Sequence, residues 1–326
     1  MIARYAIYFF LFIGLLTPPL LFYVLSRWLL PRRYRWWGTL ACTVFIYLLL
    51  WHGFHGGFER LEVHEFEFVS ADLPPAFDGY RIVQFSDAHV GTYEGRRAWM
   101  LRRMVDSINA QHADAIVFTG DLENLSPRDL DHKVATLGLL TAPDGVYSVL
   151  GNHDYEIYLD VDETTRLKDE RRTCQLERQM GWTLLLNEHR VVRRDTDSIV
   201  IAGMENWGKV KRMPRRGDIK RTLEGLSLPP DTQRPFIIML QHDPSCWREK
   251  ILPECHAQLT LSGHTHGGQF SLFGWSPVGL TTNEWGGLYT EGDRALFVST
   301  GVGGLIPFRL NMPGEIVVIT LRRNKK

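Results

Sequence analysis

The chain has 326 residues, enough for one large domain or two modest ones. Lysine plus arginine and aspartate plus glutamate both total 37, so the formal net charge is zero, and this balance gives no global attraction to nucleic acid or to an anionic membrane. None of the four cysteines forms a C-x-x-C pair, which argues against a thiolate zinc site or a redox motif. Cys246 and Cys255 are close enough in sequence to pair in an oxidising compartment, although cysteines are more often buried apolar side chains.

Two uncharged, apolar stretches open the chain, at about residues 5–26 and 36–57. Each can reach the ~20 residues that a helix needs to cross a bilayer core, and backbone groups in lipid must bond internally, so both stretches are predicted to be transmembrane helices. Pro18 and Pro19 predict a kink in the first. A signal peptide is the competing interpretation, but the second apolar stretch follows at once and no small-residue cleavage site is evident. Residues 1–58 are therefore predicted to form a membrane anchor.

Basic residues predict how this anchor is oriented. The short connection between the helices carries Arg27, Arg32, Arg33 and Arg35. The positive-inside rule places such a connection in the cytoplasm. The chain after residue 58 would then lie outside a bacterial inner (cytoplasmic) membrane as an extracytoplasmic domain.

The remainder of the chain changes character. Residues 59–75 alternate charged and apolar side chains, which predicts a linker and an edge strand. From residue 76 to residue 326, short apolar runs alternate with helical patterns, which is typical of βαβ units with buried strands. Strands are expected at 81–85, 115–119, 146–150, 183–186, 198–202, 236–240, 258–261, 295–299 and 316–321, with helices at 98–109 and 132–140. This is too many strands for one ordinary open sheet, so we expect two packed sheets flanked by helices.

Clusters of metal-type ligands follow five of these predicted strands. In α/β sheets, binding sites gather beyond the carboxyl ends of the strands, so the clusters would meet at one rim. The candidate ligands are Asp87, His89, Asp121, Asn152, His242, His264 and His266. Carboxylate, amide and imidazole groups together suit Mn, Zn or Fe(II) better than Mg. Seven ligands are too many for one tetrahedral site but fit two ions that share a bridging carboxylate.

A single Asp-x-His or His-x-His pair would be weak support, because such pairs are often turn residues. The ordered set is stronger, since burying this many unpaired polar groups for packing alone would be unfavourable. Gly120, Gly151 and Gly263 precede three of the clusters, where the backbone must turn tightly near an ion.

The ordered segments resemble the calcineurin-like metallophosphoesterases. The matching segments are Asp87-Ala-His89, Gly120-Asp121-Leu-Glu-Asn124, Gly151-Asn-His-Asp154, His242 and Gly263-His-Thr-His266. Gly267-Gly268-Gln269 and the run 301–315 look like the membrane-associated bacterial branch, and the resemblance covers roughly residues 62–321. Asn124 departs from the many members that carry aspartate there, at a position that is not expected to be a primary ligand.

The resemblance implies a four-layer α/β/β/α sandwich and a set of roles. One ion would be held by Asp87, His89, Asp121 and His266, and the other by Asp121, Asn152, His242 and His264, with Asp121 bridging. His153 would lie over the substrate phosphate, oriented by Asp154, so these two are the candidate catalytic residues. The implied activity is hydrolysis of phosphomono- or diesters with two divalent ions (Mn, Zn or Fe) as the cofactors.

Several alternatives stay open at this stage. The substrate could be a lipid-linked or envelope-related phosphoester, and a pyrophosphatase acting on a UDP-linked acylated glucosamine would need a cytoplasmic domain, which the arginines argue against. A non-catalytic, metal-stabilised membrane adaptor is opposed by the intact ligand set. A metallo-β-lactamase type is excluded because His264-Thr-His266 is followed by Gly-Gly-Gln. The expected partners are the substrate and the bilayer, with no nucleic acid. Arg309 could reach a substrate phosphate, although a structural role is favoured.

Overall fold

The computed structural model describes residues 17–226 and 234–324; residues 1–16, 227–233 and 325–326 lie outside the described part. The chain divides into two compact units, Met1–Gly57 and Phe58–Lys326. Each unit is described by itself.

The first unit is helical throughout its described residues, apart from short turns. Residues 17–29 form a helix, and a 3-10 turn at Arg32–Tyr34 leads into α2 (Arg35–His52) and a π-helical turn at Gly53–Gly57. Within the described residues, Arg32–Gly57 is the one helix long and apolar enough to cross a membrane, by length and composition. The predicted span 36–57 lies inside it. Of the predicted span 5–26, the part up to residue 16 lies outside the described residues and the rest is helical.

The second unit contains two six-stranded sheets. In spatial order, the first sheet consists of β1 (Leu61–Ser70), β12 (Gly314–Arg323), β2 (Arg81–Phe85), β3 (Ala115–Phe118), β4 (Val146–Ser148) and β5 (Thr183–Leu184). The second sheet consists of β10 (Gly287–Glu291), β11 (Arg294–Val298), β9 (Leu259–Ser262), β8 (Ile237–Leu240), β7 (Asp197–Gly203) and β6 (Glu188–Arg194). Strands β2 to β5 are mutually parallel, as are β7, β8, β9 and β11, so each set ends at one edge of its sheet.

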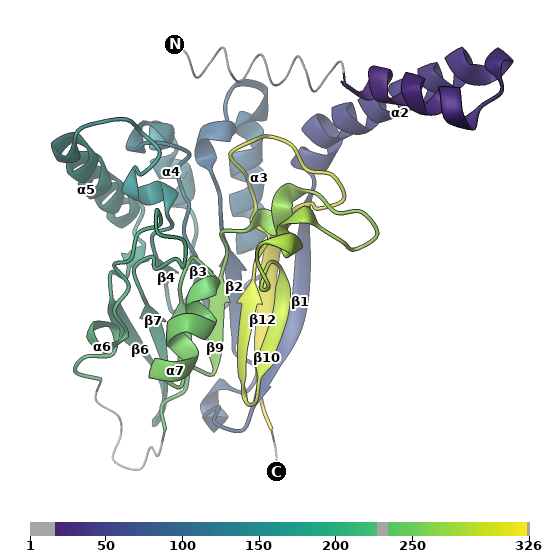
Figure 1. Ribbon diagram of the computed structural model, residues 1–326. Helices are drawn as coiled ribbons and strands as arrows, with labels where there is room; N and C mark the ends of the chain where they lie inside the picture. The colour runs from purple at the N-terminus through teal and green to yellow at the C-terminus, as the bar shows by residue number, and fades with distance from the viewer. Residues whose placement is uncertain (1–16, 227–233, 325–326) are drawn as a thin grey trace. The chain divides into compact units, whose positions relative to one another are not determined.

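Helices cover the outer face of each sheet. The first sheet is covered by α3 (Ala98–Asn109), α4 (Val134–Leu137) and α5 (Glu163–Gln179), and the second by α6 (Ile219–Thr222), α7 (Leu252–Glu254) and the π-helical turn Trp247–Ile251. In Figure 1, α3 lies behind the sheets and α7 in front of them. One apolar cluster lies between the first sheet and its helices, and another lies between the second sheet and its helices. A third apolar cluster lies between the two sheets, which pack face to face. The predicted α/β/β/α sandwich is therefore confirmed.

The alternation of side chains along β2 shows how the sequence specifies these layers. Ile82 belongs to the cluster between the two sheets, whereas its neighbour Val83 belongs to the cluster beneath the helices. Successive side chains of a strand point to opposite faces, and both faces are covered here, so the strand is apolar almost throughout. On α3, Met104, Val105 and Ile108 supply the facing apolar stripe.

Two sequence-based expectations need correction or completion. The helix expected at 132–140 is limited to the short α4, because a 3-10 turn precedes it and the chain leaves the helix at Gly138. All four cysteines are free, so Cys246 and Cys255 do not pair.

A buried carboxyl on α5 makes stability depend on pH. Glu177 is fully buried, and its Oε2 accepts a hydrogen bond from the Ser148 hydroxyl at 2.5 Å while Oε1 has no partner. Burial, assisted by the charge of Asp154, raises the pKa of Glu177 from 4.5 to about 8. The folded state therefore keeps a proton that the unfolded state loses, and stability falls as the pH rises from 4.5 to about 8 and then levels off.

We expect Glu177→Gln to remove this loss. Between pH 5 and pH 8.5 the wild type should lose on the order of 4 kcal/mol of unfolding free energy more than the variant, at ~1.4 kcal/mol per pH unit. Denaturant unfolding of the detergent-solubilised protein across this range measures it. Glu163→Gln, at an exposed position of the same helix, should follow the wild type. Parallel curves for Glu177→Gln and wild type would show that Glu177 is ionised in the folded protein.

Candidate metal centre

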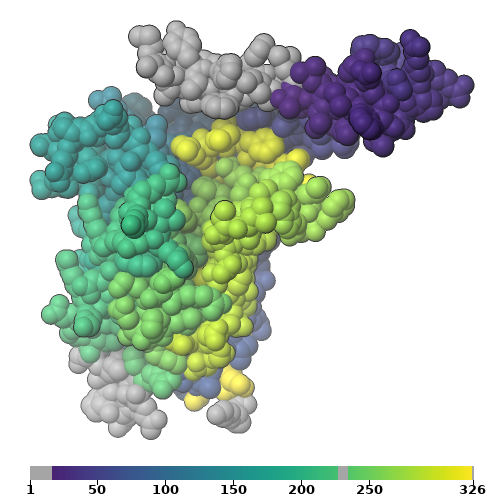
Figure 2. Space-filling view, in the orientation of Figure 1, coloured from purple at the N-terminus to yellow at the C-terminus, as the bar shows by residue number. Residues whose placement is uncertain are grey.

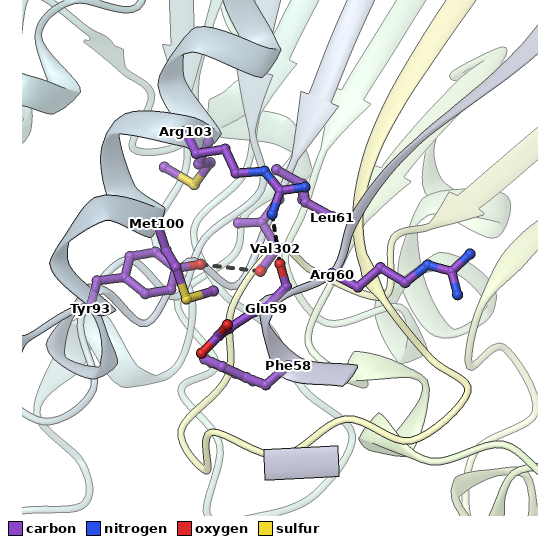
Figure 3. Close-up of a pocket in the computed structure, with 9 residues that line it drawn as sticks. Phe58, Glu59, Arg60, Leu61, Tyr93, Met100, Arg103 and Val302 are labelled. Carbon is purple, nitrogen blue, oxygen red and sulfur yellow. Dashed lines mark hydrogen bonds between the residues drawn. The ribbon is translucent and has the colours of Figure 1, made fainter. Parts of the chain in front are cut away.

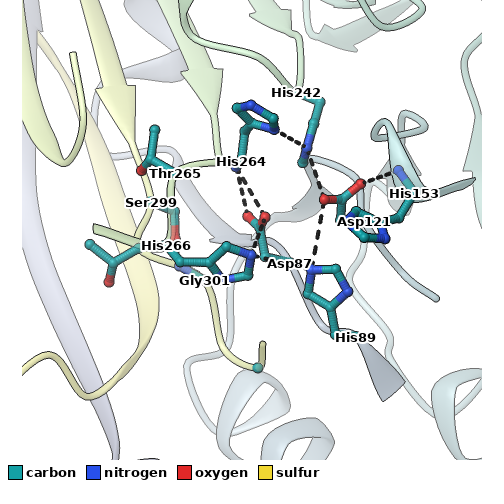
Figure 4. Close-up of polar contacts among 12 residues, drawn as sticks. Asp87, His89, Asp121, His153, His242, His264, Thr265, His266, Ser299 and Gly301 are labelled. Carbon is teal, nitrogen blue, oxygen red and sulfur yellow. Dashed lines mark hydrogen bonds and ion pairs between the residues drawn. The ribbon is translucent and has the colours of Figure 1, made fainter. Parts of the chain in front are cut away.

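The candidate ligands lie on turns that follow five parallel strands. Asp87 and His89 follow β2, Asp121 follows β3, and Asn152 follows β4. From the second sheet, His242 follows β8, and His264 with His266 follows β9. Figure 4 shows the side chains of the two sheets converging at this edge.

The backbone of these turns is in a conformation that residues other than glycine rarely adopt. The φ angles are positive at Asp87 (52°), His89 (41°), Asp121 (61°), His264 (75°) and His266 (52°). Positive φ is disfavoured for residues other than glycine, and such strain concentrates at functional sites where the surrounding structure enforces it. The side chains are therefore held by the fold rather than by local preference.

Glycines next to the ligands allow the turns to approach one another. A Cβ atom at Gly151 would collide with the carboxylate and backbone of Asp121, and one at Gly263 with the side chains of Ser86 and Asp87. Both glycines therefore stand where any larger residue would displace a carboxylate ligand.

One cluster of ligand atoms comprises Asp87, His89, Asp121 and His266, whose atoms all lie within 4.8 Å of one another. His89 Nε2 is 3.2 Å from His266 Nε2 and 3.7 Å from Asp121 Oδ2. His266 Nε2 lies 3.3 Å from Asp87 Oδ1.

A second cluster shares Asp121 with the first and adds His242 and His264. His242 Nε2 is 3.2 Å from Asp121 Oδ2 and 3.2 Å from His264 Nδ1. The Asn152 side-chain oxygen lies 3.1 Å from the same Nε2. All seven sequence-predicted ligands are thus brought together, with Asp121 common to both clusters.

The side chains of His89, His242 and Asn152 each also form a hydrogen bond to a group outside the clusters, and this bond determines which of their atoms faces the clusters. His89 Nδ1 donates to the Glu123 carbonyl at 3.0 Å, and His242 Nδ1 donates to the Thr119 carbonyl at 2.7 Å. Because a carbonyl only accepts, the neutral form of each ring presents the Nε2 lone pair to the cluster. Asn152 Nδ2 donates to Tyr158 Oη at 2.9 Å, which turns the amide oxygen inward. Acceptor atoms therefore face one another, and a divalent cation fits between them.

Electrostatics agree with this donor set. Burial lowers the pKa of His89 to about 3 and that of His266 well below its usual value, so both rings are neutral and able to ligate. Burial alone would raise the pKa of Asp121, but the charge of His242 holds it well below the usual range. Burial alone would lower the pKa of His242, but Asp121 raises it to about 10. Without a cation, Asp121 and His242 form a buried ion pair, and a cation would take over the role of its proton.

His153 lies at the edge of the two clusters and is partly exposed. Its Nδ1 donates to the Asn124 carbonyl at 2.6 Å, and its backbone N–H donates to Asp121 Oδ1 at 2.8 Å. Its ring stacks on Tyr158, with the ring centroids 4.3 Å apart. The expectation that Asp154 orients this ring is wrong, because the Asn124 carbonyl occupies the nitrogen that Asp154 would need.

Asp154 instead stabilises the ligand turns. Its carboxylate accepts from the backbone N–H groups of Asp121, Leu122, Glu123 and Gly151 at 2.8–3.2 Å. These bonds tie the turn after β3 to the turn after β4. Asp154 is therefore a positioning residue.

Two residues near the site were not identified from the sequence. Tyr158 holds both the Asn152 amide and the His153 ring, and no spacing pattern marks it. Asp243 is buried, with Oδ2 3.7 Å from His264 Nε2. Its position directly after His242 was the available sign.

Arg309 has the structural role favoured from the sequence. It is fully buried, and its guanidinium donates to five backbone carbonyls, those of Thr300, Gly301, Gly303, Met312 and Pro313. It fixes the segment whose Gly303 N–H donates to the Asp87 carbonyl at 3.0 Å. A groove of about 260 Å³ opens beside His264 and includes Lys209, Ser245, Arg248 and Thr282 in its lining.

Comparison with known proteins places this geometry in a family context. The family described as calcineurin-like phosphoesterase matches residues 80–268. The chain is 33% identical over 272 residues to the uncharacterized metallophosphoesterase YkuE of Bacillus subtilis, covering 80% of this chain and 86% of that protein. It is 29% identical to a Danio rerio transmembrane protein with metallophosphoesterase domain, covering 87% of this chain but only 63% of that longer protein.

Among solved structures, the phosphopantetheinyl hydrolase PptH of Mycobacterium tuberculosis aligns with a TM-score of 0.42 at 12% identity, over 71% of this chain and 92% of that one. A dimetal phosphatase from Danio rerio aligns with a TM-score of 0.39 at 14% identity, over 71% of this chain and 89% of that one.

Proposed function

Because this chain belongs to the calcineurin-like phosphoesterase family, we propose that it is a membrane-anchored, dinuclear phosphoesterase that hydrolyses phosphomono- or diesters. Its general class, a metal-dependent phosphoric ester hydrolase, follows from the family and from its relatives. The observation that carries the dinuclear proposal is the convergence of acceptor atoms in two clusters that share Asp121.

In this proposal each cluster holds one ion. Asp87, His89, Asp121 and His266 would hold the first ion, and Asp121, Asn152, His242 and His264 would hold the second. When bound, divalent cations (Mn, Zn or Fe) would lower the pKa of an attacking water and neutralise charge on the phosphoryl oxygens. The nitrogen and oxygen donors suit these metals.

His153 is the proposed hydrogen-bond donor and acid for the substrate. Its Nδ1–H is committed to the Asn124 carbonyl, so Nε2 is the nitrogen that remains for the substrate. In the imidazolium form, Nε2–H donates to a phosphoryl oxygen or gives its proton to the leaving oxygen. Tyr158 stacks on the ring and keeps it in place.

The groove beside His264 would receive the rest of the ester. Its lining includes charged residues that are already paired: Lys209 Nζ lies 2.6 Å from Glu249, and the Arg248 guanidinium lies 3.2 Å from Glu291. Polar groups such as Ser245 and Thr282 also line it. This mixture favours a polar leaving group.

The location is proposed on separate grounds. The apolar helix Arg32–Gly57 and the printed name of the Danio rerio relative support anchoring in a membrane. The arginines before and at the start of this helix favour an extracytoplasmic domain on a bacterial inner membrane. A lipid or envelope phosphoester would then be within reach.

Two variants test the assignment of ligand and acid. Asn152→Ala should lose one ion and lower turnover of bis(4-nitrophenyl) phosphate by on the order of a hundredfold or more. His153→Ala should keep both ions and still lose about a hundredfold, the usual contribution of a positioned acid. Elemental analysis of Mn-reconstituted protein gives the ion content, and Lys168→Ala, exposed on α5, is the neutral control. Full activity in both variants would refute the assignment.

A further inference from the structure

The topology shows where the chain enters the second unit. β12 runs antiparallel to β2, and β1 runs parallel to β12. The amino-terminal ends of β1 and β12 therefore lie at the same edge as the carboxyl ends of β2, β3 and β4, which is the edge that carries the metal ligands. The chain enters at Phe58, directly after the apolar helix that ends at Gly57, so no linker separates the helix from this edge.

The first residues of the unit are packed firmly in place. Phe58 is buried, and with Tyr93, Met100 and Val302 it lines a small cavity (Figure 3). Arg103 donates to the Glu59 carbonyl at 2.8 Å. The first residues of the second unit are thus packed in place at its metal-bearing edge.

Two loops at this edge expose a group of large apolar side chains, here called the apolar rim. Its members and their exposed fractions are Leu272 (49%), Phe273 (100%), Trp275 (51%), Leu280 (76%), Leu305 (44%) and Ile306 (58%). Figure 2 shows the lime-green segment that contains the first four projecting from the surface. Exposed apolar side chains gathered on neighbouring loops are typical of an interaction site.

Backbone hydrogen bonds hold the first loop of the rim in a defined turn. Leu272 and Trp275 exchange backbone hydrogen bonds of 2.8 and 3.0 Å, which close a tight turn with φ of 51° at Phe273 and 80° at Gly274. A phenylalanine is strained at positive φ, and here its ring makes no use of the domain core, because it is fully exposed.

The two loops are also joined to each other and to the metal centre. Gln269 Nε2 donates to the carbonyls of Ile306 and Phe308 at 3.0 and 2.8 Å, and Ser271 N–H donates to the Leu310 carbonyl at 2.9 Å. Gln269 is only three residues from His266. These bonds connect the two loops beside the turn that carries His266.

The same edge carries interfacial residue types. Trp99, near the start of α3, is 47% exposed, and the Arg103 guanidinium lies over its ring. Arg60 and Arg96 are also exposed, and both are close in sequence to residues that line the cavity. Tryptophan and arginine are the residues that favour the headgroup region of a bilayer.

We propose that the apolar rim inserts into the bilayer that holds the chain's own helix, so that the metal centre faces the membrane surface and acts on the phosphoester of a bilayer-resident amphiphile. This rests on the proposed function, in that the helix must be anchored and the centre must be hydrolytic. We favour a lipid surface as the partner that covers the rim, because the second unit continues directly from an apolar helix. If a partner protein covered the rim instead, the rim would lie outside lipid.

Spin labels test the depth of the rim. The full chain, with Cys42→Ser and Cys255→Ala to remove accessible thiols, is placed in nanodiscs of phosphatidylcholine and phosphatidylglycerol. Labels at Phe273→Cys and Leu280→Cys should collide more with oxygen than with a water-soluble nickel chelate, as should one at Leu48→Cys on α2. A label at Leu139→Cys, an exposed site at the opposite end of α3, should show the reverse.

Each outcome bears on one part of the proposal. If the label at 48 lies in lipid and the label at 273 in water, the membrane-inserting rim is refuted while the anchor stands. A label at 48 in water refutes the anchor and the rim together. Turnover of bis(4-nitrophenyl) phosphate in the same nanodiscs reports on hydrolysis separately, so its absence with a buried label at 273 would refute the proposed activity and leave the rim.

A substitution in the rim tests the substrate class. Phe273→Asp should lower turnover of a nanodisc-embedded, acylated nitrophenyl phosphodiester at least tenfold and leave turnover of the soluble diester within twofold. Leu139→Asp should change neither rate. Equal loss on both substrates would show that the rim only supports the fold of the site. No loss on either would show that the rim has no part in reaching a bilayer-resident substrate, and either outcome would refute the proposal.

Discussion

Asp121→Asn is expected to abolish binding of both metal ions and to lower turnover by on the order of a thousandfold. Asp121 is the one residue common to both clusters, with Oδ2 3.2 Å from His242 Nε2 and 3.7 Å from His89 Nε2. An asparagine removes the negative charge that two cations would share. It also places an NH₂ donor either among acceptor atoms or against the His153 N–H that now donates to Oδ1.

Elemental analysis and turnover of an aryl phosphodiester after Mn reconstitution measure both effects. Asp106→Asn is the matched control, because Asp106 is an exposed aspartate on α3 that pairs with Arg102 on the same helix. It should retain both ions and full turnover. If Asp121→Asn kept one ion and a rate within tenfold of wild type, the two clusters would be independent sites and the bridging role would be wrong.

The ligands could be predicted from sequence because each is adjacent to a strand that is apolar on both faces. The run Arg81–Phe85 is predicted and observed with the same limits, and Asp87 follows it after one residue, Ser86. The carboxyl ends of parallel strands share an edge, so polar residues placed there must converge whatever the lengths of the connections. No knowledge of long-range contacts was needed for that step.

Elements whose stability comes from distant partners were harder to predict. The pattern of residues 59–75 predicts an edge strand, but not that β1 pairs in parallel with β12 at the other end of the chain. Helix α5 was not predicted, because its buried face includes Thr173 and Glu177 rather than an apolar stripe. Strand β6 is an edge strand with few buried residues, so its sequence resembles a loop.

The same limit applies to the residues around the ligands. The family resemblance implied Asp154 as the partner of His153. In the structure, His153 Nδ1 instead donates to the carbonyl of Asn124, a group that every residue type possesses. Asp154 is satisfied by backbone N–H groups instead. Residue type specifies what a side chain can bind, and only the folded backbone decides which of several neighbours it meets.

Gly263→Ala is expected to empty the first cluster without changing any ligand. Gly263 lies between β9 and His264, and an added Cβ would collide with the side chains of Ser86 and Asp87. Both are fully buried, and the Asp87 carboxylate is held by the His264 N–H at 3.0–3.1 Å, so neither can move aside freely. Overpacking of this kind lowers stability by about 1–3 kcal/mol, and displacing Asp87 should lower turnover by about a hundredfold.

Metal content, turnover and thermal unfolding together separate this effect from general destabilisation. Gly292→Ala is the control, because Gly292 has φ of 64° with no atom near its Cβ position, so alanine adds backbone strain without a collision. It should lower stability by about 1 kcal/mol and leave both ions bound. If Gly263→Ala were destabilised to the same extent as Gly292→Ala but kept both ions and a wild-type rate, the carboxylate of Asp87 would be free to adjust. The first cluster would then be shaped by the cation when it binds, and the strained, glycine-flanked turns would not be the feature that positions it.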